Sequence, residues 1–129
     1  IPVQSAELRS EARELAARVR DFGLAVQNVL MDYRKRAGSD DELKLMEVVL
    51  KHQYPQERLA DAAADLFVSS CTLSRLDALL GIANGAAERD VQSGRYFLTL
   101  ANRRIKQNLA ALWDNDDAMT TRTADQIIS

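Results

Sequence analysis

Cysteine and histidine, which often catalyse reactions or bind metals, each occur only once in this 129-residue sequence. The single cysteine, Cys71, lies in the apolar segment 66–73, where we expect the thiol to pack as a small hydrophobic residue. The single histidine, His52, lies between two polar residues, which is typical of a solvated imidazole. The two are too far apart in sequence for an ordinary zinc site, and one cysteine excludes an internal disulfide. Neither residue indicates an enzyme.

Asp61 and Asp65 form the best-placed pair of carboxylates, because they lie one helical turn apart. Di-metal sites in helical bundles combine such carboxylates with Glu-x-x-His pairs, and the sequence contains no such pair. Two carboxylates alone are weak ligands for anything except a hydrated ion. We therefore predict no metal site. We expect Asp61 to pair with Arg58, three residues earlier, and Asp65 to contact another helix or domain.

Basic side chains gather at 34–36 and at 103–104, as helix-end cations often do. The glycine-containing segment 81–85 lacks both the lysine of a phosphate loop and the strand context of a dinucleotide site. A net charge of -2 leaves no basic surplus for nucleic acid. We therefore predict no catalytic or cofactor-binding residue within this chain, and no nucleic-acid partner.

The composition predicts that helices position these residues. Hydrophobic residues make up 47% of the chain and are mainly Ala and Leu, whereas aromatic residues make up only 5%. Between Ser5, a candidate N-cap, and Ala37, apolar side chains recur at alternating spacings of four and three residues. Gly38 should end this first helix. The heptad stripe comprises Leu8, Ala12, Leu15, Val19, Phe22, Val26, Val29 and Tyr33.

The second helix should begin at a capping box made of Ser39 and Glu42. Pro55 then either opens a new helix or kinks one continuous helix, and the periodicity does not decide between these alternatives. Beyond Pro55 a third stripe continues to Gly81. It comprises Leu59, Ala62, Leu66, Ser69, Leu73, Leu76 and Leu80, and we predict that it belongs to the central helix.

A fourth helix should start near Asp90, and a short last helix should cover about 118–128. Long amphipathic helices with short connections predict a single all-α domain over 1–129, folded as an antiparallel up-and-down bundle of about four helices. No segment approaches the roughly 20 apolar residues of a membrane span, and no signal peptide is recognisable. We expect a soluble protein of the cytoplasm.

The segment 56–67, QERLADAAADLF, followed by Leu73-Ser74-Arg75, resembles the C-terminal domain of very-long-chain-type acyl-CoA dehydrogenases. In that family a helix reads Arg-Leu-Ala-Asp, a small residue, Ala, an aliphatic residue, Asp-Leu, an aromatic residue, and then Leu-Ser-Arg. This sequence differs at Ala64, where the aliphatic residue is usually larger, and at Phe67, where tyrosine is usual. The start at Ile1, without methionine, is then interpreted as a domain boundary.

The resemblance implies a parent enzyme that uses FAD and a glutamate base to oxidise the α,β bond of a fatty acyl-CoA in β-oxidation. Flavin site and base belong to an upstream catalytic region, so this chain alone should be non-catalytic. The resemblance implies that the domain packs on the catalytic core and supports a homodimer. In mitochondrial members a loop between the helices is linked to membrane attachment. The corresponding segment, 81–90, has one basic residue, Arg89, so we expect no membrane attachment here.

Four charged residues of the matching segment are our candidates for the interface with the catalytic region or within a dimer, and they should be unpaired or loosely paired inside the chain: Arg58, Asp61, Asp65 and Arg75. The alternative is a stand-alone helical module for self-association or protein interaction. Copies of such a module would associate through their heptad stripes, such as that of the first helix. An independent enzyme is the third interpretation, and the missing acid, base and nucleophile argue against it.

Overall fold

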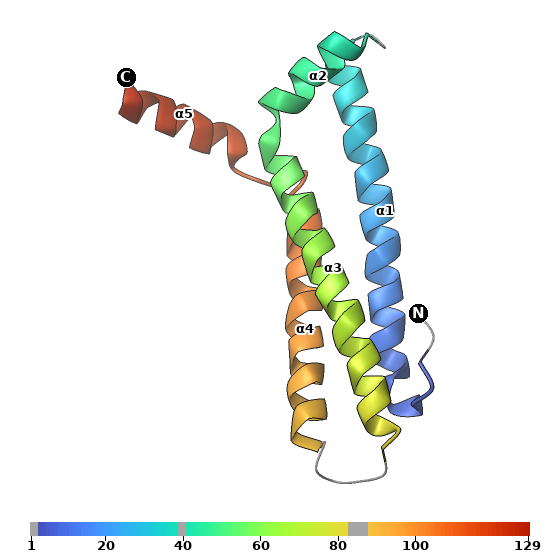
Figure 1. Cartoon of the computed structure of the whole chain (residues 1–129). Helices are drawn as coiled ribbons and strands as arrows, with labels where there is room; N and C mark the ends of the chain where they lie inside the picture. Colours follow the sequence, from blue (N-terminus) through green and yellow to red (C-terminus); the bar gives the residue numbers. More distant parts are fainter. Residues whose placement is uncertain (1–2, 39–40, 83–87) are drawn as a thin grey trace.

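A computed structural model describes residues 3–38, 41–82 and 88–129 (Figure 1). These ranges contain helices and no strand. The elements are η1 (Ala6–Leu8), α1 (Arg9–Ala37), α2 (Glu42–Lys51), α3 (Gln53–Leu80), α4 (Glu88–Ala110) and α5 (Asp117–Ile128). The long helices α1, α3 and α4 lie side by side in alternating directions, α2 joins α1 to α3 at one end, and α5 projects away. The predicted all-α antiparallel bundle of about four helices is confirmed.

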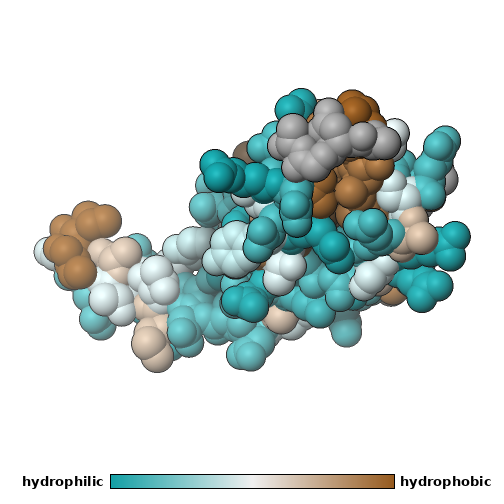
Figure 2. Space-filling model, turned by 90° about the horizontal axis from the view of Figure 1, so that it is seen from below, coloured by the Kyte–Doolittle hydropathy of each residue, from teal (hydrophilic) through white to brown (hydrophobic). Residues whose placement is uncertain are grey.

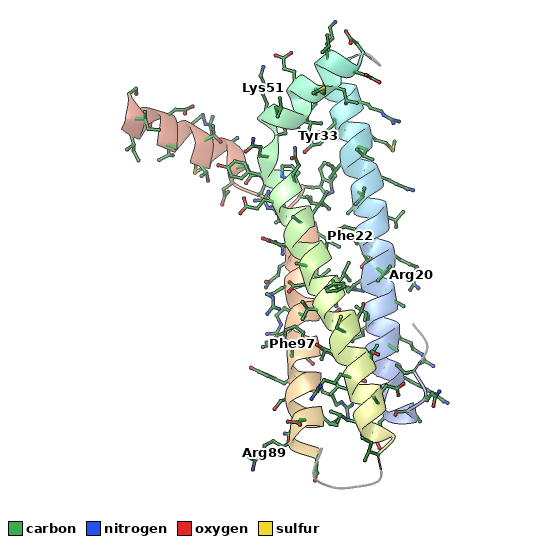
Figure 3. The ribbon with its side chains drawn as sticks, in the orientation of Figure 1. Arg20, Phe22, Tyr33, Lys51, Arg89 and Phe97 are labelled. Atoms are coloured by element: carbon green, nitrogen blue, oxygen red, sulfur yellow. The ribbon has the colours of Figure 1, made fainter. Side chains whose placement is uncertain are left out.

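The predicted stripes build the core of the bundle. On α1 most stripe residues are buried or half-buried, and only Val19 is exposed. Figure 3 shows Phe22 and Tyr33 on the side of α1 that faces the other helices, whereas Arg20 points away. The central core joins residues of η1 and of the three long helices: Leu8, Ala12, Leu15, Ala62, Leu66, Leu73, Leu76, Val91, Leu98 and Ile105. The first helix therefore packs its heptad stripe against the other helices of the same chain.

The first helix begins and ends by different means. Ser5 makes no side-chain cap, which corrects its predicted role. The start of the chain is held instead by Asp77 of α3, whose carboxylate accepts hydrogen bonds from the backbone N–H groups of Gln4 and Ser5 at 2.8–3.2 Å. At the other end Gly38 has a φ of 66°, in the left-handed region that favours glycine, and ends the helix as predicted.

The structure separates α2 from α3 at His52, whose φ and ψ of -111° and 71° are not helical. Pro55 lies in the first turn of α3, where its missing N–H needs no helical partner. The carbonyl of His52 accepts hydrogen bonds from the Tyr33 hydroxyl at 2.8 Å and from Gln56 Nε2 at 3.2 Å. Pro55 thus opens a new helix. Asp41 caps α2 by accepting from the Leu43 N–H, while the predicted cap Ser39 lies outside the described residues.

Candidate functional site

Arg58 is the first of the four interface candidates, and it is held by the chain itself. Its guanidinium donates two hydrogen bonds to the Asp117 carboxylate, at 2.6 and 2.7 Å, where α5 begins. The expected ion pair between Arg58 and Asp61 is therefore wrong. A guanidinium that meets a carboxylate with two parallel hydrogen bonds is bound more strongly than one in a single contact along a helix.

Asp65 is also held within the bundle. Its two carboxylate oxygens accept from Arg104 Nη2 at 2.9 Å and from Arg104 Nε at 3.2 Å, which joins α3 to α4. This confirms the expectation that Asp65 contacts another helix. The guanidinium of Arg104 also lies over the ring of Phe97, with Cζ 5.8 Å from the ring centroid.

The pKa values of Asp117, Arg58 and Arg104 are shifted in the direction that favours their charged forms. The hydrogen bonds from Arg58 lower the pKa of Asp117, and the partial burial of that carboxyl opposes the shift. The same bonds raise the pKa of Arg58, and the contact with Asp65 raises the pKa of Arg104. These two pairs therefore connect α3 to its neighbours, so Arg58 and Asp65 would be available to a partner only through their remaining exposed atoms.

The other two candidates, Asp61 and Arg75, are exposed and have no hydrogen bond or ion pair within the described ranges. They lie on one face of α3, because the positions 61, 64, 68, 71 and 75 follow each other at spacings of three and four residues. We call this the outer face of α3; it consists of Asp61, Ala64, Phe67, Val68, Cys71 and Arg75, all exposed. A rise of 1.5 Å per residue separates its charged ends by about 21 Å.

Phe67 is 71% exposed and is the largest apolar side chain of the outer face. The structural placement of Cys71 corrects its predicted packing, since the thiol is free and exposed beside Val68 rather than buried. The predicted inward stripe of α3 omits both Phe67 and Cys71, so their exposure could have been read from helical periodicity. No comparable signal exists for Asp117 and Arg104, the partners that the sequence analysis did not find.

His52 is half-buried at the junction of α2 and α3 rather than solvated. Its Nδ1 lies 2.9 Å from the Val48 carbonyl oxygen, and its Nε2 lies 3.3 Å from Arg36 Nη1. The ring centroid is 6.2 Å from that of Tyr33. These contacts give the imidazole a structural role in ending α2.

Two of the hollows between the described helices are relevant to cofactor binding. The partly open pocket among α1, α3 and α4 has a volume of about 20 Å³, far below the roughly 300–1,000 Å³ of small-molecule and cofactor pockets. A groove beside α5 is larger, about 460 Å³, and is lined by charged side chains such as Lys51 and Arg122 together with apolar ones such as Leu112. Among the described residues no cluster of three or more potential metal ligands occurs, and none of the helices could cross a membrane.

Fold and surface together describe a helical-bundle domain in which one exposed face of α3 carries apolar side chains between two charges. The chain matches the family model described as "ACAD9/ACADV, C-terminal domain" over residues 6–129. It therefore belongs to the family of C-terminal domains of very-long-chain-type acyl-CoA dehydrogenases, as its sequence resemblance indicates. No curated protein and no solved structure gives a significant match.

Proposed function

We propose that this chain is the non-catalytic C-terminal domain of an FAD-dependent acyl-CoA dehydrogenase and that it docks on the catalytic region through the outer face of α3. The observation that carries the proposal is the exposure of Phe67 and Val68 between the unpartnered charges of Asp61 and Arg75, on the helix that carries the family's sequence pattern.

The outer face has the physical properties of a docking surface. Burying a phenylalanine side chain contributes about 1.5–3 kcal/mol, and Phe67 does not gain this energy within the chain. The small side chains of Ala64 and Cys71 allow a partner to approach the helix closely. Opposite charges at the two ends favour one orientation of the partner, because a reversed partner would place like charges together.

In this proposal the redox chemistry belongs to the catalytic region. That region would bind FAD and the fatty acyl-CoA of β-oxidation and would carry the base, while this domain would stabilise it and support a homodimer. Arg89, the basic residue nearest the start of α4, does not make an amphipathic basic face. We accordingly place the parent enzyme in the cytoplasm without membrane attachment.

Cys71 allows a direct test, because it lies on the outer face and is the only cysteine of this chain. The rate of maleimide labelling at Cys71 would be measured by peptide mass spectrometry, for the 129-residue chain and for a longer polypeptide that includes the upstream catalytic region. Docking should slow labelling by about ten-fold or more in the longer protein, because a covered thiol reacts only when the contact opens.

The matched control places a cysteine elsewhere on the bundle. Tyr96 is exposed on α4, so Y96C in a C71S background should label equally fast in both proteins. Equal labelling of Cys71 in both proteins would refute docking through this face. The visible spectrum of the same samples tests the cofactor: flavin absorption is expected from the longer protein and not from the 129-residue chain.

A second candidate function, self-association of a stand-alone module, is favoured by one observation on α5. This helix has no buried residue, and Ile127 and Ile128 are at least 80% exposed. Figure 2 shows this apolar cluster at the free end of α5, away from the rest of the molecule. Since the stripe of α1 is used in the core, self-association would use α5. Light scattering at increasing concentration, with I127D as the comparison, tests it; an unchanged monomer mass would exclude it.

A further inference from the structure

One face of α1 carries four exposed arginines, which we call the arginine row: Arg9, Arg13, Arg20 and Arg34. None of their guanidinium groups makes a hydrogen bond or an ion pair within the described ranges. At 3.6 residues per turn the four side chains fall within an arc of about 60°, and a rise of 1.5 Å per residue spreads them over about 38 Å. Figure 3 shows Arg20 on the side of α1 that points away from the other helices.

The acidic residues of α1 do not offset the positive charge of the arginine row. Helical periodicity places all of them on other sides of the helix: Glu11, Glu14, Asp21 and Asp32. Three of these four carboxylates pair with other arginines of the chain, at 2.7–3.3 Å. The helix therefore separates its paired charges from a face that carries unpaired positive charge alone.

The N-terminal end of the arginine row borders an open hollow of about 280 Å³. Arg9 and Arg13 line this hollow together with Val3, Ala12 and Ala16, and no acidic side chain is among the described residues that line it. Two guanidinium groups beside small apolar side chains suit a carboxylate together with its methylene groups. Arg9 lies in the first turn of α1, where the positive end of the helix dipole makes a cation unfavourable. Its charge therefore does not serve the stability of its own helix.

We propose that the arginine row binds an acidic helix of a separate protein. A guanidinium group can bind a carboxylate through two parallel hydrogen bonds, which gives the contact both strength and orientation. A partner helix that lies along α1 can place Asp and Glu side chains opposite the row at intervals of one or more turns. The arginine row is on α1 and the outer face is on α3, so this proposal does not depend on docking of the catalytic region.

The surroundings of the arginine row favour a protein partner over a membrane or a nucleic acid. Exposed apolar side chains border the row on both sides, with Val19 and Leu30 along one edge and Leu24 and Met31 along the other. Arginine and methionine are enriched in protein interfaces. A helix that lies on a membrane has one continuous apolar face opposite its charges, whereas here the charges stand between two apolar edges. The net charge of -2 gives no long-range attraction for the backbone of a nucleic acid.

The first test measures binding of poly-L-glutamate to the 129-residue chain by isothermal titration calorimetry at low salt. R13A/R20A should weaken binding about five-fold or more, because two of the four guanidinium contacts are lost. The matched control is R103A/R122A, which removes two other exposed arginines without a partner in the described ranges. Both double variants change the net charge equally, so the control should change binding by less than about two-fold. Equal weakening by the two double variants would overturn the proposal, as would the absence of binding to the unaltered chain.

The second test compares three anionic probes with the unaltered chain, so it does not depend on any variant that must fold. Poly-L-glutamate, vesicles of phosphatidylglycerol and a DNA duplex are titrated under the same conditions, at equal total concentrations of negative charge. We expect the tightest binding to poly-L-glutamate, because the apolar edges of the row can also contact its methylene groups. Tighter binding to the vesicles or to the duplex would overturn the proposal of a protein partner and assign the row to that surface instead.

Discussion

Gly94 of α4 lies directly against Leu76 of α3, and adding one methyl group there should test how tightly the bundle is packed. A Cβ built on Gly94 would lie 2.6 Å from Leu76 Cδ2, 2.9 Å from Cδ1 and 3.0 Å from Cγ. Real Cβ atoms do not come this close to another carbon, so a side chain or helix must move. Leu76 is only 3% exposed, which leaves its side chain no open space to enter.

The expected size of the effect follows from two opposing terms. Overpacking a well-packed core costs about 1–3 kcal/mol. Alanine in place of glycine within a helix returns about 1 kcal/mol. G94A should therefore lower the free energy of unfolding by up to about 2 kcal/mol. Gly23, inside α1, provides the matched control because a Cβ there meets no atom within 4 Å. G23A should instead raise the free energy of unfolding by about 0.5–1 kcal/mol.

The assay is urea unfolding followed by circular dichroism at 222 nm, with the two variants and the unaltered chain measured side by side. The same chemical change should move the unfolding midpoint in opposite directions at an unchanged m-value. Truncating the neighbour, as L76V, should reduce the cost of G94A because the clash involves the δ carbons. A G94A variant that is stabilised as much as G23A would refute the close packing of α3 against α4.

Two further predictions concern polar contacts. R58A removes both hydrogen bonds to Asp117, so the amides of α5, which has no buried residue, should exchange hydrogen faster while α4 keeps its protection; unchanged exchange in α5 would show that other contacts hold it. The backbone N–H groups of Gln4 and Ser5 lower the pKa of Asp77, so its contribution to stability is complete above the unfolded-state pKa of about 3.9 and is lost as the pH falls through the lower folded-state pKa. D77N should accordingly flatten the acid limb of the stability curve, measured by urea unfolding at several pH values, and an unchanged slope would contradict this.

Much of the fold could be predicted because helical signals are local. The stripe of α1 specifies which side chains face inward, and Gly38 ends the helix because only glycine adopts a φ of 66° without strain. Whether Pro55 opens a new helix or kinks a continuous one is not decided by a local signal. It is decided three residues earlier, at His52, whose carbonyl accepts a hydrogen bond from the Tyr33 hydroxyl of α1. A hydrogen bond between different helices cannot be inferred from the spacing within one of them.

The candidate interface shows the same difference between local sequence signals and contacts made between helices. The family pattern pointed to α3 and to four of its charged residues, but not to their partners. Arg58 binds Asp117, 59 positions further along the chain, rather than the nearby Asp61. Asp65 binds Arg104, which is 39 positions away. Only Asp61 and Arg75 stay available in the described structure, so the proposed docking surface is smaller than the predicted set and includes apolar residues outside it.

The sequence by itself determined the all-helical class, most of the helix ends, the core-facing stripes and the family. The tertiary structure decided that Pro55 begins a separate helix, that α5 projects from the bundle, and which charges are paired. It also brought polar residues of three helices to the lining of one pocket, among them Glu11, Ser69 and Asn102. The reason is physical. Helical periodicity depends on backbone geometry over a few residues, whereas side-chain pairing depends on the register between helices, which is set only when the bundle packs.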